Sequence, residues 1–271
     1  MATFANIPAP RQDGVGTAPV VWLWVAVRWP VRLLKAKFFK ILPSPKKEVF
    51  MKPITLSFDN GPTPGITDEV LSILARYDVR STFFVIGNKV RASAKASDLV
   101  TLAKSQGHWI GNHTDSHSIP LGRSEPPEAA IAEIERAQQT MGEAVHPNRL
   151  FRPFGGGGRL GPDLLNKSAL DVLIRDRYTC VIWNSVPGDW PTPENTHGAW
   201  VERAQHQIRD LDWPLVVLHD IEGACLERLD EFLTWLKTEN YDVRQEFPED
   251  CLLIKDGSIQ PDRNLDQLIS G

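Results

Sequence analysis

Cysteine is scarce in this chain, with three in 271 residues. Cys180, Cys225 and Cys251 lie far apart and form no C-x-x-C pair, which argues against a zinc knuckle and against a disulfide framework. We interpret them as separate buried thiols, a usage that suits a reducing compartment. An excess of positive charge is also missing. The net charge of -4 and the pI of about 6.0 provide no basic field, so we do not expect nucleic acid as a partner.

The chain also lacks an apolar run of the roughly 20 residues that a spanning helix needs. The stretch Pro19–Val27 is apolar but is soon interrupted by Arg28 and Pro30. Only one positive charge precedes it and no small-residue cleavage site follows, so we identify no secretion signal and favour a cytoplasmic location. The basic and apolar stretch that follows, up to Lys40, leaves two interpretations open. We favour an arm packed on the folded domain with its lysines in water, over a basic amphipathic helix in peripheral contact with a membrane.

From Pro53 onward, short β-branched or aromatic runs alternate with longer amphipathic stretches, a pattern typical of β-α units around a parallel sheet. Seven strands are expected: Ile54–Phe58, Ser81–Ile86, His108–Asn112, Arg149–Phe154, Tyr178–Trp183, Pro214–His219 and Tyr241–Gln245. Apolar residues at helical spacing lie between them and predict one outer helix per interval. We expect an N-terminal arm and linker over 1–47, one α/β domain over 48–247 and a C-terminal extension with weak local structure over 248–271.

Periodicity does not separate a closed barrel from an open doubly wound sheet, but both place their sites at the carboxyl ends of the strands. The polar or glycine residues that follow five of the expected strands are Asp59, His113, Gly155, Asp189 and Asp220. We therefore expect five strand ends to contribute to one rim.

Three segments carry side chains suited to chemistry. His113 and His117 are four residues apart, so a helical turn would put both imidazoles on one face, ready to bind one metal ion or simply to lie at the surface. Asp59 and Asn60 precede Gly61-Pro62, a pattern that predicts a tight turn holding two polar side chains near the rim, or an ordinary Asn-Gly turn. His219 follows four apolar residues. It is either a general acid with a tunable pKa or a hydrogen-bonded core histidine.

These segments occur in the order and spacing of the motifs of the polysaccharide deacetylases, the NodB-homology proteins of carbohydrate esterase family 4. SFDNGP at 57–62 resembles the family's T-F-D-D-G-P, and HTDSH at 113–117 meets its H-[ST]-x-x-H. RPF at 152–154, DW at 189–190 and LH at 218–219 are similar to its third, fourth and fifth motifs. The resemblance covers roughly residues 53 to 236 and implies a distorted (β/α)7-type barrel.

The resemblance also implies roles for individual residues. Asp59 stands where the family has its general base, and His219 where it has the acid that protonates the leaving amine. His113, His117 and Asn60 match the metal ligands. Asp189 matches the carboxylate that tunes the acid, and Arg152 the residue that holds the base. The hydrophobic walls of the acyl pocket correspond to Trp190 and Leu218, with Phe154 near the substrate.

Two positions depart from the family pattern. Asn60 replaces an aspartate ligand, and an amide oxygen can coordinate but brings no negative charge, so metal affinity should fall. Four glycines follow Phe154 where the family has Pro-Tyr-Gly. Either Phe154 stands in for the tyrosine or this shorter loop takes a different path. Without Lys-Ser/Thr the glycines are not a phosphate-binding loop.

The expected function is therefore metal-dependent removal of N-acetyl or other acyl groups from amino sugars of a poly- or oligosaccharide. A divalent ion would acidify water and stabilise an oxyanion. Zinc is the expected metal, with cobalt or nickel as alternatives. Two other functions stay open. One is a catalytically impaired protein that binds carbohydrate without turnover, and the other is a metal-independent amidase that acts on a small C–N substrate through Asp59 and His219.

Overall fold

The structure is a computed structural model that describes residues 51–192, 199–261 and 265–270. Their main sheet has the strand order β10-β9-β6-β4-β3-β2-β1-β7, and β8 pairs with β1. The strands are β1 Lys52–Asp59, β2 Thr82–Val85, β3 Trp109–Asn112, β4 Leu150–Phe151, β6 Thr179–Val181, β7 Leu215–His219, β8 Tyr241–Arg244, β9 Leu252–Lys255 and β10 Ser258–Ile259. A separate parallel pair joins β5 Leu165–Asn166 to β11 Ile269–Ser270.

The seven strands expected from the sequence are all present, and they pair in parallel. The ring closes irregularly between β7 and the segment that follows β6. There, Ser185 bridges Val216, with the amide of Ser185 donating to the Leu215 carbonyl and the amide of Val217 donating to the Ser185 carbonyl. The fold is therefore a distorted (β/α) barrel, as the family resemblance implies, and not the open doubly wound sheet that periodicity alone left as an alternative.

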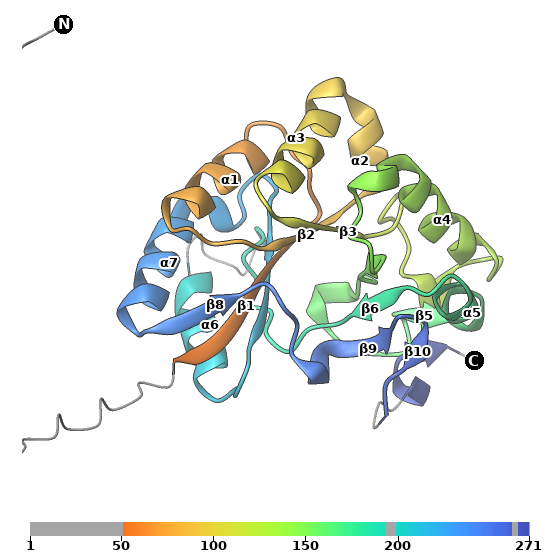
Figure 1. Cartoon of the computed structure of the whole chain (residues 1–271). Coiled ribbons are helices and arrows are strands. Elements are labelled where there is room, and N and C mark those ends of the chain that lie inside the picture. Colours follow the sequence, from red (N-terminus) through yellow and green to blue (C-terminus); the bar gives the residue numbers. More distant parts are fainter. Residues whose placement is uncertain (1–50, 193–198, 262–264, 271) are drawn as a thin grey trace, which may run out of the picture. The chain divides into compact units, whose positions relative to one another are not determined.

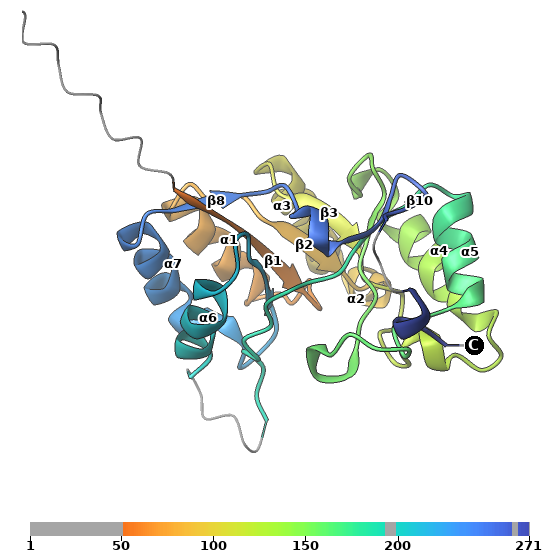
Figure 2. The same ribbon diagram turned by 90° about the horizontal axis from the view of Figure 1, so that it is seen from below.

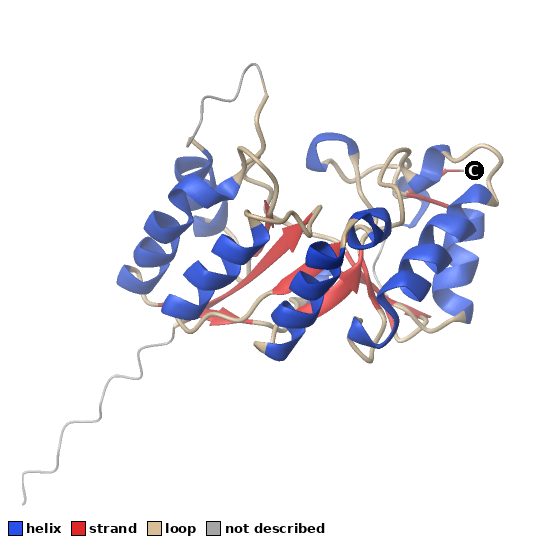
Figure 3. Cartoon of the chain, turned by 90° about the horizontal axis from the view of Figure 1, so that it is seen from above, coloured by secondary structure: helices blue, strands red, loops and turns tan. Residues whose placement is uncertain are grey.

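Helices surround the strands on the outside (Figures 1 and 3). They are α1 Thr67–Arg76, α2 Gly87–Ala92, α3 Ala94–Ser105, α4 Ala129–Met141, α5 Lys167–Arg175, α6 Trp200–Arg209 and α7 Leu229–Thr238. The ends of two of them are fixed by short polar side chains, since Ser93 accepts from the Ala96 amide before α3 and Asn166 from the Ala169 amide before α5. Figure 2 shows α6 and α7 at one end of the molecule and α4 and α5 at the other.

Alternation along each strand assigns side chains to one of two apolar clusters. On β7, for example, Val216 and Leu218 belong to a cluster shared with α1, α6 and α7, whereas Leu215 and Val217 belong to a cluster shared with α5 and β9. β1 is buried from Ile54 to Asp59 because it lies between β2 and β7. The buried centre of the sheet thereby gives the residues at the strand ends a rigid support.

The expectation of weak local structure after Pro248 is wrong. β9 pairs antiparallel with β6 and its first three residues are buried, and β10 continues that edge of the sheet. The physical reason is the apolar run Leu252–Ile254, which covers the side of β6 away from β4. The division of the chain at 48 and 247 stays a prediction.

The predictions for the N-terminal arm and its membrane contact fall on residues 1–47, outside the described residues. Within the described ranges, no helix combines the length and the apolar character needed to cross a membrane.

Candidate active site

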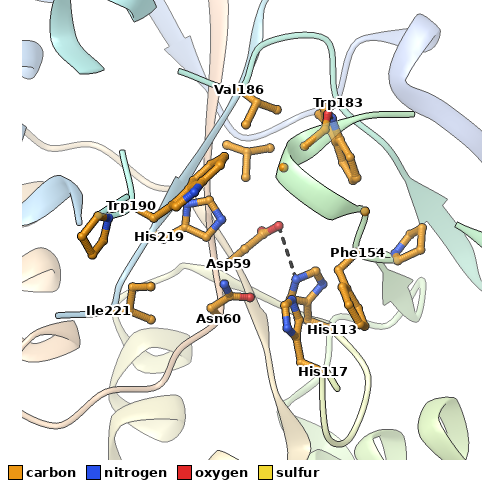
Figure 4. A pocket seen from close by; sticks show the side chains of 16 residues that line it. Asp59, Asn60, His113, His117, Phe154, Trp183, Val186, Trp190, His219 and Ile221 are labelled. Carbon is orange, nitrogen blue, oxygen red and sulfur yellow. Dashed lines mark hydrogen bonds and ion pairs between the residues drawn. The ribbon is translucent and has the colours of Figure 1, made fainter. Parts of the chain in front are cut away.

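A cavity of about 340 Å³ opens at the carboxyl ends of the strands (Figure 4). Asp59 ends β1, His219 ends β7, and His113 directly follows β3. Asp59 and His219 are register partners in adjacent parallel strands, so their side chains project to the same side of the sheet. The cavity is lined by sixteen residues, among them Asp59, Asn60, His113, His117 and His219. Of the five residues expected at one rim, Asp59, His113 and Gly155 line the cavity, whereas Asp189 and Asp220 do not.

Asp59 is held by a buried arginine. Nη1 of Arg152 donates to Oδ1 of Asp59 at 2.8 Å and to Oγ of Ser57 at 2.7 Å. The Arg152 side chain is fully buried and lies over the ring of Phe84, 4.0 Å from its centroid. Burial lowers the pKa of Arg152, and the neighbouring Asp59 carboxylate opposes that change. The pairing fixes one carboxylate oxygen and leaves Oδ2 facing His113.

His113 is positioned as a neutral ligand-type imidazole. Its Nδ1 lies 2.8 Å from the Arg152 carbonyl, which can only accept, so Nδ1 carries the hydrogen and Nε2 has a free lone pair. Nε2 lies 3.6 Å from Oδ2 of Asp59. Burial lowers the pKa of His113 to about 3, and burial together with the nearby His113 lowers the pKa of His117 to about 3. Both imidazoles are therefore neutral near pH 7.

The expected helical turn from His113 to His117 is wrong. The segment is an irregular loop in which Thr114 and His117 have positive φ values of 69° and 52°. The two left-handed residues turn the chain back on itself, and the imidazole centroids still lie only 4.9 Å apart. The predicted pairing of the two rings is thus achieved by a turn rather than by helical spacing.

Three side chains hold the histidine loop, which consists of residues 113–117, through hydrogen bonds. The side-chain oxygen of Asn112 accepts from the Thr114 amide. Oε2 of Glu133, on α4, accepts from the amides of Asp115 and Ser116 at 3.1 and 2.8 Å. Arg91 at the end of α2 donates two hydrogen bonds to the Asp115 carboxylate. These hydrogen bonds fix residues 114–116, which connect His113 to His117.

Removing the Glu133 carboxylate is expected to loosen the histidine loop. Glu133→Ala leaves two backbone amides without their acceptor, so affinity for zinc should fall by roughly 10- to 100-fold, as it does when partners of metal ligands are lost. A competition titration with a chromophoric chelator measures this. Glu133→Gln, which keeps an acceptor oxygen, should restore most of the affinity. Glu135→Ala is the matched control, since Glu135 is exposed on the same helix and pairs with Arg175. Equal losses in Glu133→Ala and Glu135→Ala would contradict the anchoring role.

Asn60 presents an amide oxygen to the site. Its backbone has a φ of 77°, a conformation that asparagine adopts more readily than most residues. Its Oδ1 is buried and makes no hydrogen bond within the protein. Gly61 follows because a Cβ there would collide with the buried carboxylate of Asp220. An unpartnered buried oxygen beside two neutral imidazoles is a donor set that a divalent ion can complete.

The described residues contain no group of three His, Cys, Asp or Glu side chains placed to hold a metal ion. The predicted set has a different composition, with the imidazoles of His113 and His117 and the amide of Asn60. These three line the same cavity, and the Asn60 oxygen has no other partner. The residues present thus fit a divalent metal that accepts nitrogen and neutral oxygen donors.

His219 lies across the cavity from these donors and is paired with Asp189. Nδ1 of His219 donates to Oδ1 of Asp189 at 2.7 Å, and its backbone amide donates to Oδ2 at 2.8 Å. Burial alone would lower the pKa of His219, but the Asp189 carboxylate, with smaller contributions from Asp59 and Asp220, raises it above 6.5. The Trp190 ring meets the imidazole edge-on at 5.0 Å. His219 is therefore oriented with Nε2 free to act toward the cavity.

The assignment of Leu218 to the cavity wall is wrong. Leu218 is fully buried in the cluster under the outer helices, and its neighbour Val217 lines the cavity. The reason is strand alternation, which puts residue 217 on the same face of β7 as His219. Trp190 and Phe154 do line the cavity. Phe154 stacks on the His117 ring with 3.8 Å between centroids, so it covers the imidazole from one side.

Besides Val217, the sequence analysis missed the lining residues Trp183, Val186, Pro191 and Ile221. Trp183 and Val186 lie in the segment between β6 and Asp189, and Ile221 lies two residues after His219. The only signal available was a position at the last residue of an expected strand, for Trp183, or shortly beyond one, for the others, which by itself does not show which way a side chain points.

Comparisons with known proteins place this geometry in context. A family model described as polysaccharide deacetylase matches residues 46–175. A peptidoglycan-N-acetylglucosamine deacetylase of Bacillus cereus is 32% identical over 197 residues, which cover 70% of this chain and 84% of that protein. The peptidoglycan-N-acetylmuramic acid deacetylase PdaC of Bacillus subtilis is 27% identical over 209 residues, which cover 75% of this chain. This chain spans 40% of the length of PdaC.

Solved structures agree on the fold. A crystal structure of a peptidoglycan N-acetylglucosamine deacetylase superposes with a TM-score of 0.60 at 19% identity and covers 76% of this chain and 90% of that one. A carbohydrate esterase family 4 pseudoenzyme from Bacillus anthracis gives a TM-score of 0.57 at 19% identity and covers 71% of this chain and 63% of that one. At these identities the likeness concerns the fold alone.

Proposed function

Because this chain belongs to the polysaccharide deacetylase family, we propose that it hydrolyses the amide bond of N-acylated amino sugars in a poly- or oligosaccharide. One observation carries the proposal. A carboxylate and an imidazole of raised pKa, Asp59 and His219, project from register-paired positions into one cavity whose far side holds two neutral imidazoles. A base and an acid on opposite sides of a reacting carbonyl are what amide hydrolysis requires.

The proposed reaction divides proton transfer between the two groups. Asp59 accepts a proton from the attacking water while a C–O bond forms at the acyl carbon. His219 then donates its Nε2 proton to the amine nitrogen as the C–N bond breaks, which releases a carboxylic acid and a free amine. Arg152 holds Asp59 in place, and Asp189 keeps the Nδ1 hydrogen of His219 on the side away from the substrate.

We propose that His113, His117 and Asn60 hold the metal ion, with zinc expected and cobalt or nickel as alternatives. Held there, such an ion supplies Lewis acidity to the carbonyl oxygen and to the water. The chain's own contribution is to keep both imidazoles neutral and to aim an unpartnered amide oxygen at the same space.

The test of this function is acyl release from defined substrates. The zinc-loaded full chain is incubated with chitooligosaccharides and with peptidoglycan fragments, and new free amines are quantified with fluorescamine. Amine release that a chelator stops and zinc restores supports the proposal. Failure to release amine from any N-acylated glycan, with zinc bound at one equivalent, contradicts it.

A second candidate function rests on Asn60, which brings no charge to the metal site. A chain with weakened metal binding could keep its cavity and bind carbohydrate without turnover. Calorimetry separates the two functions. Saturable binding of a chitooligosaccharide that yields no free amine at saturating zinc favours carbohydrate binding alone.

The pH profile should report the His219–Asp189 pair. The acid must be protonated, so kcat/KM should fall as pH rises through the pKa of His219, and that alkaline limb should lie above pH 6.5. Asp189→Asn removes the charge that raises this pKa, so the limb should move to lower pH. Rate measurements from pH 5 to 10 on both proteins check this. A limb at the same pH in both would show that the group titrating is not His219.

A further inference from the structure

One side of the cavity is apolar. Five of its sixteen lining residues are the polar ones discussed above, and the other eleven are apolar side chains or glycines. In the view of Figure 4, Val186 and Trp183 lie on the other side of Asp59 from Asn60 and His117. The cavity therefore has an apolar region around Val186 and Trp183, apart from the candidate metal donors, while Phe154 covers His117 on the other side.

The apolar region begins directly beneath the reacting groups. Val217 precedes His219 by two residues on β7 and so shares its face, pointing into the cavity. Val217 therefore lies on the cavity side of β7, next to His219 on that face, and Val186 and Trp183 line the same cavity.

The loop beside this region presents glycines, and so no side chains, to the cavity. Gly157 lines the cavity with a φ of 64°, and a Cβ added to it would meet no atom within 4 Å. Trp183 and Val186 fix the position of the glycine loop at the edge of the cavity. The carbonyl of Gly158 accepts from Nε1 of Trp183 at 2.7 Å, and a Cβ on Gly158 would lie 2.7 Å from Cγ1 of Val186. Trp183 and Val186 thus line the apolar region and also hold the glycine loop in place at its edge.

The cavity as a whole, its polar part included, measures about 340 Å³. An apolar cavity of about 150 Å³ can hold a benzene ring. A sugar ring is a poor occupant for the apolar region, because its hydroxyl groups would lose water there without gaining side-chain partners. The indole N–H of Trp183 already donates a hydrogen bond to the Gly158 carbonyl, so it is not free to bind a sugar hydroxyl.

We infer that this apolar chamber, formed by Trp183, Val186, Val217 and the backbone of Gly157 and Gly158, binds the N-acyl chain of the substrate and accepts chains longer than acetyl. The inference rests on the proposed function and adds the class of acyl group to it. The reaction is the same hydrolysis, with a short fatty acid in place of acetate as the released carboxylic acid.

The first test is a chain-length series. Glucosamine oligomers carrying N-acetyl, N-butanoyl or N-hexanoyl groups are offered to the zinc-loaded enzyme, and the free amine is measured, since it is the same product in all three. We expect kcat/KM for the butanoyl substrate to equal or exceed that for the acetyl substrate. Release of amine from the acetyl substrate with a loss of tenfold or more for butanoyl, a size of effect that one or two methylenes produce in a pocket that excludes them, overturns the inference and leaves the proposed function intact. No amine from any member contradicts the proposed function itself.

The second test fills the chamber. Val186→Phe should shift the ratio of butanoyl to acetyl kcat/KM toward acetyl by roughly tenfold or more. Gly157→Asn adds a side chain to the open space in a backbone conformation that asparagine tolerates, and should shift the ratio the same way. Gly156→Ala is the matched control, since Gly156 does not line the cavity and its Cβ would meet nothing. Folding of each variant is checked by thermal unfolding. An unchanged ratio in a folded Val186→Phe or Gly157→Asn variant overturns the chamber.

Discussion

An Asp59→Asn variant should lose roughly 10²- to 10⁴-fold in kcat for amide hydrolysis, because an amide oxygen cannot take the proton that the carboxylate accepts from water. The variant keeps an oxygen for Arg152, whose Nη1 lies 2.8 Å from Oδ1 of Asp59. The buried guanidinium nevertheless loses its anion. The loss of such a partner costs about 3–5 kcal/mol of folding free energy in buried pairs. Steady-state kinetics and thermal unfolding must therefore be measured on the same preparations.

Ser57→Ala is the control that separates the two effects. Ser57 accepts from the same Nη1 of Arg152 at 2.7 Å but does not line the cavity. Its removal disturbs the hold on Arg152 and leaves the Asp59 carboxylate in place. We expect kcat to fall far less in Ser57→Ala than in Asp59→Asn. If both variants lost activity equally, Asp59 would act only by holding Arg152, and the role of base would be excluded.

Much of the fold could be predicted because parallel β-α units leave a strong local signal. The strand β7 is a short apolar run, β1 alternates apolar residues with threonine and serine, and the intervening helices show a regular apolar face. β9 was missed because Leu252–Ile254 is a three-residue apolar run after a proline. Its place at the edge of β6 depends on antiparallel pairing with a strand some 70 residues away, and nothing local encodes that pairing.

The site could be predicted at the level of residue types but not of side-chain directions. His113 and His117 come together through two left-handed residues, Thr114 and His117 itself, rather than through a helix. Leu218 and Val217 exchange roles because one step along a strand reverses the face. The order of motifs locates a strand end in the sequence, whereas the register of β7 against β1 decides which of two adjacent residues faces the cavity.

The chamber residues show a different limit. Val186 and Trp183 have no motif around them, and they reach the cavity because the segment after β6 bridges to β7 at Ser185. That bridge closes the distorted barrel and sets the direction of the following loop. Only the closed ring shows that the glycine loop and Val186 share one wall.

Asn60→Asp should change stability in opposite directions with and without metal. The Oδ1 of Asn60 is buried and unpartnered, so a carboxylate there would add a second negative charge next to Asp59 without a cation to balance it. We therefore expect a lower Tm than wild type in chelator. With zinc, the charged ligand should tighten binding by on the order of 10- to 100-fold, the range over which changes around a metal centre alter affinity, and mass action then raises Tm above that of wild type.

A lower Tm in chelator combined with a higher Tm in zinc tests whether Asn60 is a metal ligand. Zinc affinity is measured by chelator competition and Tm by calorimetry, in wild type and Asn60→Asp. The backbone should not interfere, since aspartate and asparagine both tolerate the φ of 77° at this position. His117→Ala should remove zinc binding from both backgrounds, because both sets need the second imidazole. Equal zinc affinities in wild type and Asn60→Asp would mean that residue 60 is not a ligand, and the metal, if bound, would have to be held by His113 and His117 with another donor.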